Sequence, residues 1–294
     1  MIARATLGGI FVAILLIGIC YAALSPILQP IGLPRIQMPW SAVGTGVIEQ
    51  YSLVKGTNVS SAVRFVNLNA TVKFGGILVL FSNDLNLVLK AVFEHGPSAS
   101  ELDANSAPDG SDRLQANTYG AAGSLNLTLG SSCQYGGSLN LRFGAVTMQL
   151  DQYSNIGKLA IKINYVGGVL LNVTSGASFE QLDVSMDVGG LQLNVNAENI
   201  ERSGKITTNV NMGGVIVNAA VSTAHVGMSV EADVDTGGLT VDQTYFEGTV
   251  SNTHCSVKTH DYASANTKLD VRASIGAGGG IIQPSTSYVP GFST

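Results

Sequence analysis

Side chains that could hold a metal gather in two places in this 294-residue chain. The first is the stretch of residues 95–117, where acidic residues stand among Ser, Ala and Pro. Its carboxylates could coordinate Ca²⁺, which prefers oxygen ligands. Their spacing is not that of an EF-hand loop, so we favour a mobile acidic loop without strand structure. These carboxylates are Glu101, Asp103, Asp109 and Asp112.

The second place combines the side chains that bind zinc. Structural zinc sites pair their ligands at two short spacings, and this segment offers only one pair, so solvated turn residues are the expected interpretation. The run from Gly276 to Gly280 resembles a phosphate loop only superficially, because no Lys-Ser/Thr ending follows it. We therefore predict no metal and no cofactor. The zinc candidates are His254, Cys255, His260 and Asp261.

No catalytic motif is recognisable in the sequence. It has neither G-x-S-x-G nor H-E-x-x-H, and its four histidines fit no triad. A surface hydrolase would need carboxylates that converge in a cleft. The candidates lie in strand-like segments, where alternation would spread them over a solvated face. The sequence thus favours a protein that is not an enzyme. These candidates are Asp183, Asp187, Asp233 and Asp235.

Two kinds of covalent modification can be considered for a protein outside the cytoplasm. Four asparagines lie in N-x-S/T acceptors for glycans, at Asn58, Asn69, Asn126 and Asn172. Cys133 and Cys255 could form a disulfide in an oxidising compartment. The alternative is that both are free, buried thiols, because the sequence does not say whether their Cα atoms come within ~7 Å.

Glycine pairs at a nearly fixed period mark the elements that must position these side chains. Those between Lys158 and Phe246 follow one another at intervals of 22, 24 and 24 residues, and alternating apolar and polar residues flank each of them. A period of this size indicates a repeat architecture, in which one unit stacks on the next. The pairs are Gly75-Gly76, Gly167-Gly168, Gly189-Gly190, Gly213-Gly214 and Gly237-Gly238.

Two all-β architectures fit this pattern. If each glycine pair is a hairpin loop, then Val188 faces Leu191 and Met186 faces Leu193, and both strand faces become chemically uniform. We favour this antiparallel meander or sandwich. The alternative is a β-solenoid in which each glycine pair is a corner between strands. Both interpretations predict the same alternation, so the period does not separate them.

The N-terminus predicts a membrane segment. Leu7 to Leu24 is apolar almost throughout and follows Arg4, which suits a span with its N-terminus in the cytoplasm. We favour an uncleaved signal-anchor over residues 1–28, in contact with the lipid bilayer through residues 7–28. A signal peptide cut near Ala22 is the alternative.

The segment after the membrane span is rich in proline, and the rest of the chain divides into a stem, a β domain and a tail. Four prolines fall between Pro26 and Pro39, and the three of them in residues 29–42 predict a stiff stem over that segment. A β-repeat domain follows over residues 43–280, and residues 281–294 form a flexible tail. The net charge of −5 and the lack of a basic run exclude a nucleic-acid partner.

The repeat of glycine, short strand, polar turn and second strand resembles the adhesin-type "toast-rack" β-repeat domains of bacterial and archaeal surface proteins. The resemblance depends on Val166 to Phe246 and, more loosely, on Gly120 to Leu150. It implies a non-catalytic, surface-exposed domain.

From these observations we expect a membrane-anchored, non-catalytic β protein of the cell surface with a structural or adhesion role. The alternative is a module that binds or senses a lipid, a glycan or another envelope component. Contact surfaces would be the polar strand faces and the unpaired strand edges, which invite self-association or a surface-protein partner, with the tail as a possible donated strand.

Overall fold

A computed structural model describes residues 47–97, 101–221 and 225–284, which form thirteen strands and no helix. They belong to one compact unit that begins at Val47. The predicted membrane segment and stem, residues 1–28 and 29–42, lie outside the described residues. Within the described ranges, no helix is long and apolar enough to span a bilayer.

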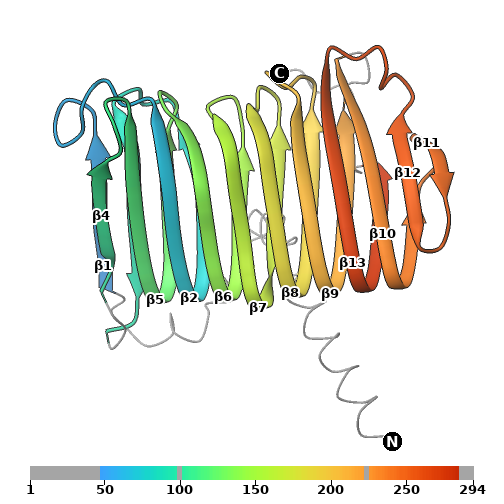
Figure 1. Cartoon of the computed structure of the whole chain (residues 1–294), viewed down its shortest axis with the longest axis horizontal. Helices are drawn as coiled ribbons and strands as arrows, with labels where there is room; N and C mark the ends of the chain where they lie inside the picture. Colours follow the sequence, from blue (N-terminus) through green and yellow to red (C-terminus); the bar gives the residue numbers. More distant parts are fainter. Residues whose placement is uncertain (1–46, 98–100, 222–224, 285–294) are drawn as a thin grey trace, which may run out of the picture. The chain divides into compact units, whose positions relative to one another are not determined.

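Eight long strands lie side by side and parallel, in an order that differs from their order in the chain (Figure 1). Each pairs in register with its neighbours over most of its length. In spatial order they are β5 (Arg113–Gly130), β2 (Phe65–Ser82), β6 (Gln134–Leu150), β7 (Ile156–Thr174), β8 (Phe179–Ala197), β9 (Gly204–Val221), β13 (Thr267–Pro284) and β10 (Val226–Val241).

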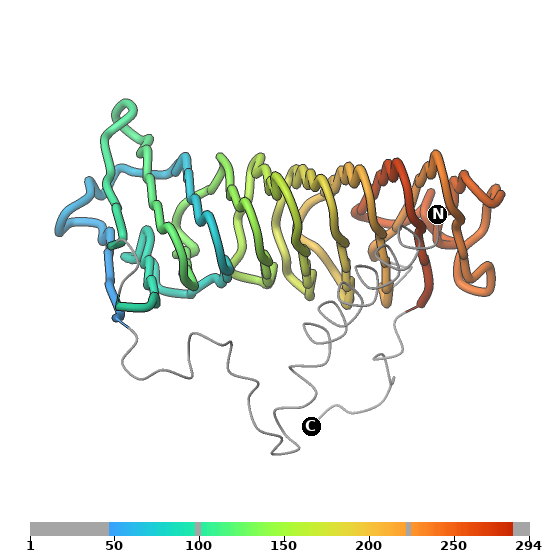
Figure 2. Tube along the Cα trace, turned by 90° about the horizontal axis from the view of Figure 1, so that it is seen from below, coloured from blue at the N-terminus to red at the C-terminus, as the bar shows by residue number. Residues whose placement is uncertain are grey.

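Each of these strands bends at a central glycine and returns behind itself, so that one strand contributes to two layers (Figures 1 and 2). We call the halves before the glycine the front layer and the halves after it the back layer. In both layers apolar and polar residues alternate, and the apolar ones point between the layers. On β8, for example, Met186 and Leu193 come from different halves and belong to the same buried core.

The favoured hairpin interpretation is therefore wrong, and the solenoid alternative is correct. Val188 pairs with Val166 and Met212 of the neighbouring strands, not with Leu191 across the glycines. The two halves of β8 face one another through their side chains, while their backbones bond to the strands one repeat away. The prediction that Met186 and Leu193 point inward is confirmed, because a bend and a hairpin leave alternation unchanged. Val188, which lies at the bend itself, is only half-buried.

The bends coincide because eight glycines form a column through the ladder: Gly123, Gly75, Gly144, Gly167, Gly189, Gly213, Gly278 and Gly237. In seven of them an added Cβ would lie 1.6 to 1.9 Å from the carbonyl oxygen of the next glycine in the column. Only glycine fits at these positions, because any Cβ would overlap with that oxygen. The predicted pairs include five of these positions; Gly123, Gly144 and Gly278 were missed because Ser or Ala follows the first two and a longer glycine run surrounds the third.

Antiparallel strands cover the β5 end of the ladder. β3 (Leu87–His95) pairs with the back half of β5, and β1 (Val47–Val54) pairs with β3. β4 (Asp103–Pro108) pairs with the front half of β5. The expected loop over residues 95–117 thus contains a strand and the start of another. Its small and polar side chains hid the pattern, because β4 is exposed or half-buried along its length and carries no large apolar residue.

The other end differs between the layers. β12 (His254–Thr259) pairs with the front half of β10, and β11 (Phe246–Val250) pairs with β12. Among the described residues, the back half of β10 has a ladder partner only on its β13 side.

At both ends of the solenoid, a strand remote in sequence fills the place between two others. β2 lies between β5 and β6, and β13 lies between β9 and β10. The predicted tail therefore begins too early, since residues up to Pro284 belong to β13. They pair with β9 of their own chain, so they are not free to be donated to a neighbour.

Candidate binding surface

The outer face of the front layer carries the polar side chains of all eight parallel strands. Successive strands present them at about 4.8 Å intervals, the ordinary spacing of a sheet. Because the strands pair in register, side chains of equivalent positions form rows across the ladder. This face is the candidate site, and its two halves differ in chemistry.

Over β4, β5, β2 and β6 the face is a network of uncharged amides and a hydroxyl. Asn67 donates a hydrogen bond to Gln115 at 2.7 Å, and Asn69 accepts bonds from two side chains of β6. These bonds hold the side chains in place before any ligand arrives. The network consists of Asn67, Asn69, Asn105, Gln115, Asn117, Ser138 and Asn140.

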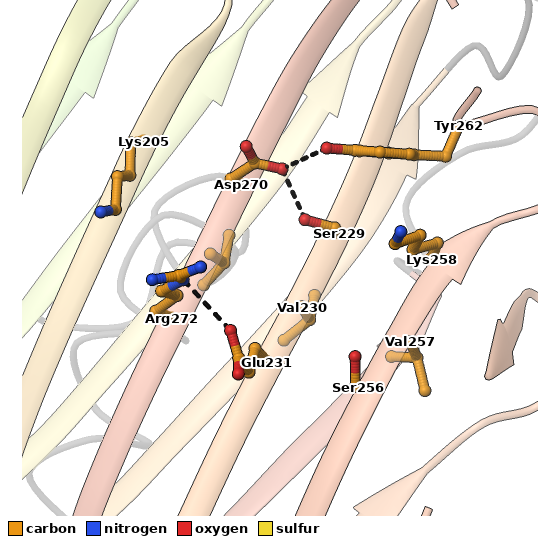
Figure 3. A pocket seen from close by; sticks show the side chains of 11 residues that line it. Lys205, Ser229, Val230, Glu231, Ser256, Val257, Lys258, Tyr262, Asp270 and Arg272 are labelled. Carbon is orange, nitrogen blue, oxygen red and sulfur yellow. Dashed lines mark hydrogen bonds and ion pairs between the residues drawn. The ribbon is translucent and has the colours of Figure 1, made fainter. Parts of the chain in front are cut away.

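Over β9, β13, β10 and β12 the face is charged and slightly hollowed (Figure 3). The hollow has a volume of about 360 Å³. At its upper side Asp270 accepts hydrogen bonds from Ser229 and from Tyr262. Below, Arg272 lies 3.1 Å from Glu231. With Lys205 and Lys258 on its rim, the hollow holds three cationic groups and two carboxylates.

Tyr262 is the most constrained side chain of this hollow. The ammonium groups of Lys258 and Lys268 each lie 5.0 Å from the centre of its ring. Burial, and secondly the hydrogen bond to Asp270, raise the pKa of its phenol. Tyr262 therefore stays protonated and donates to Asp270, which leaves the two lysines to attract an anion.

The outer face of the back layer is held by an amide ladder. Asn194 donates to Asn172 at 2.9 Å, Asn218 donates to Asn194 at 2.8 Å, and Gln283 donates to Asn218 at 2.9 Å. The ladder crosses β7, β8, β9 and β13, and thereby ties the inserted strand to its neighbours. Stacked amides of this kind satisfy one another along a strand stack.

The four predicted glycan acceptors lie in different surroundings. Asn58 and Asn69 are exposed, whereas Asn126 and Asn172 are half-buried. The Asn58 side chain closes a turn, since it accepts from the Val54 N–H and donates to the Ser52 carbonyl. Glycosylation of these asparagines stays a prediction.

The proposed disulfide does not fit the fold. Cys133 and Cys255 are both buried and free. Cys133 directly precedes β6 and Cys255 belongs to β12, so six strand-to-strand steps, roughly 29 Å, separate them. A bond needs Cα atoms within ~7 Å. Burial raises the pKa of the Cys255 thiol to about 11, which makes it a poor nucleophile.

The remaining candidates do not converge. Asp183 and Asp187 belong to β8 and Asp233 and Asp235 to β10, about 14 Å away across β9 and β13. His254 contacts Asp233 at 2.7 Å, while His260 contacts Glu247 instead. In the part of the chain that the structure describes, no three His, Cys, Asp or Glu side chains could hold a metal ion, which applies also to the carboxylates of residues 101–112.

Two features of the surface were not predicted. The hollow joins Asp270 and Lys205, which are neighbours in the ladder only because β13 inserts beside β9. Three exposed aromatic side chains lie at the bends of β2, β6 and β7: Phe74 and Phe143 directly precede a column glycine, and Tyr165 lies two residues before Gly167. Their sequence signal is the repeated aromatic residue beside glycine, as in Phe74-Gly75 and Phe143-Gly144.

Fold and surface together define the class of this protein as a two-layered β-solenoid with a polar front face. No protein-family model matches the sequence, and a comparison with curated proteins finds no significant relative. Its fold is similar to that of a solved structure described as a putative cell adhesion protein from Clostridium sporogenes, with a TM-score of 0.51 and 13% identity. The match covers 82% of this chain and 100% of the other, and shows that the two share a fold.

Proposed function

We propose that this protein is a non-catalytic β-solenoid of the cell surface with an adhesion or structural role. It is held at the membrane by the apolar segment of residues 7–28, with the β domain outside the cytoplasm; secretion after cleavage is the alternative. The observation that carries the proposal is the polar front face, which runs over eight parallel strands.

The amide half of this face suits adhesion because it repeats. Strands β5, β2 and β6 offer similar short polar groups, so that an extended polymer or another surface would make many weak contacts at once, and linked weak contacts give high avidity. The amide network is already hydrogen-bonded, so little side-chain entropy is lost on binding. The likeness of the fold to that of a putative cell adhesion protein supports the same role.

Fractionation tests the location. In its own host the full chain is expected in the membrane fraction at full mass, with added mass if the asparagine acceptors carry glycans. Recovery of a shorter chain from the medium would contradict the membrane tether and support the secreted alternative.

Retention on cells tests the role. Beads coated with the full chain should stay attached to cells of the producing strain under flow. The triple change Asn69→Ala, Asn117→Ala and Asn140→Ala should lower retention about tenfold, since it removes contacts from several strands together. The matched control is Thr147→Ala with Gln149→Ala on the back layer. Equal retention of both variants would contradict an adhesive front face.

The charged hollow favours a second candidate function, the binding of a small anionic envelope component such as an acidic sugar. Lys205 and Lys258 lie on opposite sides of it, and Tyr262 reaches in with its hydroxyl group on Asp270 (Figure 3). Glucuronate or sialic acid should then raise the melting temperature of the wild type, and Lys258→Ala should abolish the shift. A shift that persists in Lys258→Ala would exclude this site.

A further inference from the structure

Three aromatic rings form an exposed stack where the strands bend. Phe74 of β2 lies parallel to Phe143 of β6, with 5.3 Å between ring centres. Phe143 lies parallel to Tyr165 of β7 at 5.0 Å. Phe74 and Phe143 directly precede a glycine of the column, and Tyr165 lies two residues before Gly167. All three therefore project from the bend edge, the lower edge of the solenoid in Figure 1.

These rings remain open to solvent. Phe74 is 51% exposed, Phe143 38% and Tyr165 47%. Met212, in the equivalent position on β9, is 57% exposed. Large apolar side chains gathered in one exposed row on an otherwise polar protein mark an interaction site.

Basic side chains accompany the aromatic stack. Lys73 and Arg142 directly precede Phe74 and Phe143, and the Arg142 guanidinium lies 5.6 Å from the centre of the Tyr165 ring. Lys162 is exposed on the same half of β7. Carboxylates also lie toward the bend edge: those of Glu94 on β3, Glu49 on β1 and Asp103 on β4 at the β5 end, and that of Asp187 on β8.

The start of the β unit lies at the same edge. Val47 begins β1 opposite His95, the last residue of β3. The preceding residue, Glu94, pairs with Ser124, which follows Gly123 of the column. The chain that leads back to the predicted membrane segment therefore leaves the β unit at the bend edge. Val47 and Ile48 are themselves exposed there, by 38% and 60%.

We propose that the aromatic half of the bend edge, defined by Lys73, Phe74, Arg142, Phe143 and Tyr165, docks onto the headgroups of an anionic bilayer. The inference builds on the membrane tether of the proposed function. Aromatic rings favour the interface of a bilayer, and Lys and Arg near an anionic surface are attracted to its phosphates. The residues between position 28 and Val47 could span at most about 60 Å, so the tether alone does not fix the orientation. With the bend edge on the bilayer, the outer face of the front layer would point parallel to the membrane plane.

The geometry of the rings argues against a sugar as the occupant. Stacked rings cover one another's faces and leave their edges to the outside, whereas a sugar packs on an exposed ring face. Ring edges and intervening cations fit a headgroup layer, into which they can partition without a matching surface.

Tryptophan fluorescence in nanodiscs tests the docking with the full chain. Trp40, the single tryptophan, is changed to Phe, and either Phe143→Trp or Leu85→Trp is added. Leu85 is the control: it is 65% exposed in the turn between β2 and β3, away from the bend. In discs of phosphatidylcholine with phosphatidylglycerol, brominated lipids should quench Phe143→Trp at least about twofold more than Leu85→Trp.

Charge reversal separates the headgroup contact from simple proximity. Lys73→Glu with Arg142→Glu should remove the extra quenching, and so should discs of phosphatidylcholine alone. Lys205→Glu with Lys258→Glu, on the front face, should leave it unchanged. Equal quenching of the two tryptophans, or quenching that ignores the reversal at Lys73 and Arg142, would overturn the proposal. The proposal would also be overturned if the tryptophan of Phe143→Trp were shielded from solvent only in discs that hold two chains, because a second copy of the chain would then cover the bend edge.

Co-elution of the chain with the discs reports the tether independently. If the chain elutes apart from them, the tether of the proposed function fails, and the same tryptophan variants are then mixed with phosphatidylglycerol vesicles. Quenching of Phe143→Trp by brominated vesicles would support docking without a tether, and its absence would overturn docking as well.

Discussion

The column glycines allow this fold because they have no Cβ atom. At each bend the chain passes so close to the next strand that a Cβ on the column glycine would meet a carbonyl oxygen. The second residue of the bend is less constrained: an added Cβ would meet its nearest atom at 3.5 Å at Gly76 and at 3.6 Å at Gly168, and the closest approach at such a position is 2.9 Å, at Gly279. Ala145 occupies that place on β6, in register with Gly76 and Gly168.

Alanine substitutions at adjacent residues should therefore differ sharply. Gly75→Ala places a Cβ 1.8 Å from the Gly123 oxygen at a φ of +136°, and should lower the free energy of unfolding by roughly 3 kcal/mol. Gly76→Ala meets its nearest atom at 3.5 Å and should change stability by less than about 1 kcal/mol. Urea unfolding of both variants measures this, and similar losses would refute the column.

The Cys255 thiol predicts a loss of stability in alkali. Its pKa rises from 9.0 to about 11 on folding, so the unfolded chain ionises first as the pH increases. The stability contributed by the protonated thiol is complete below pH 9 and is lost as the pH rises through 11, at most about 3 kcal/mol. Compared with the wild type, Cys255→Ala should lose less stability between about pH 8 and pH 11 in urea titrations. Parallel losses would show that the thiol does not contribute.

At the scale of the element, the strands are joined by more than their backbones. The amide ladder of the back layer links β7, β8, β9 and β13. Asn194 is its central member, because it donates to one neighbour and accepts from another.

Removal of the central amide should deprive three side chains of a hydrogen bond, those of Asn172, Gln192 and Asn218. Asn194→Ala is expected to cost about 1–2 kcal/mol, since all three partners are half-buried. Asn196→Ala, an exposed position on the same strand and the same face, should cost less than about 0.5 kcal/mol. Thermal unfolding compares them, and the prediction fails if the exposed change is the more harmful.

At the scale of the whole molecule, the last strand holds the end of the solenoid. β13 pairs with β9 on one side and with β10 on the other, so β10, β11 and β12 join the ladder through it. Repeat proteins depend on such contacts between neighbours.

A chain that stops after Ala265 lacks β13, and should accordingly lose the folded structure of β10, β11 and β12 and keep that of the other strands. Amide hydrogen exchange is expected to show β10 and β12 unprotected and β6 and β7 still protected. A chain that stops after Pro284 should exchange like the full protein. Continued protection of β10 in the shorter chain would mean that it can pair with β9 directly.

The sequence by itself determined the all-β class, the inward side chains away from the bends and five of the eight column glycines, because alternation and close backbone approach are local requirements. Only the tertiary structure decided whether a glycine pair is a hairpin or a bend, since both place Met186 and Leu193 in the core. It also decided that Asp270 lies beside Lys205 and that Cys133 is far from Cys255. Those neighbours follow from the order in which strands stack, and the insertion of β2 and β13 is a long-range choice that leaves no mark on alternation.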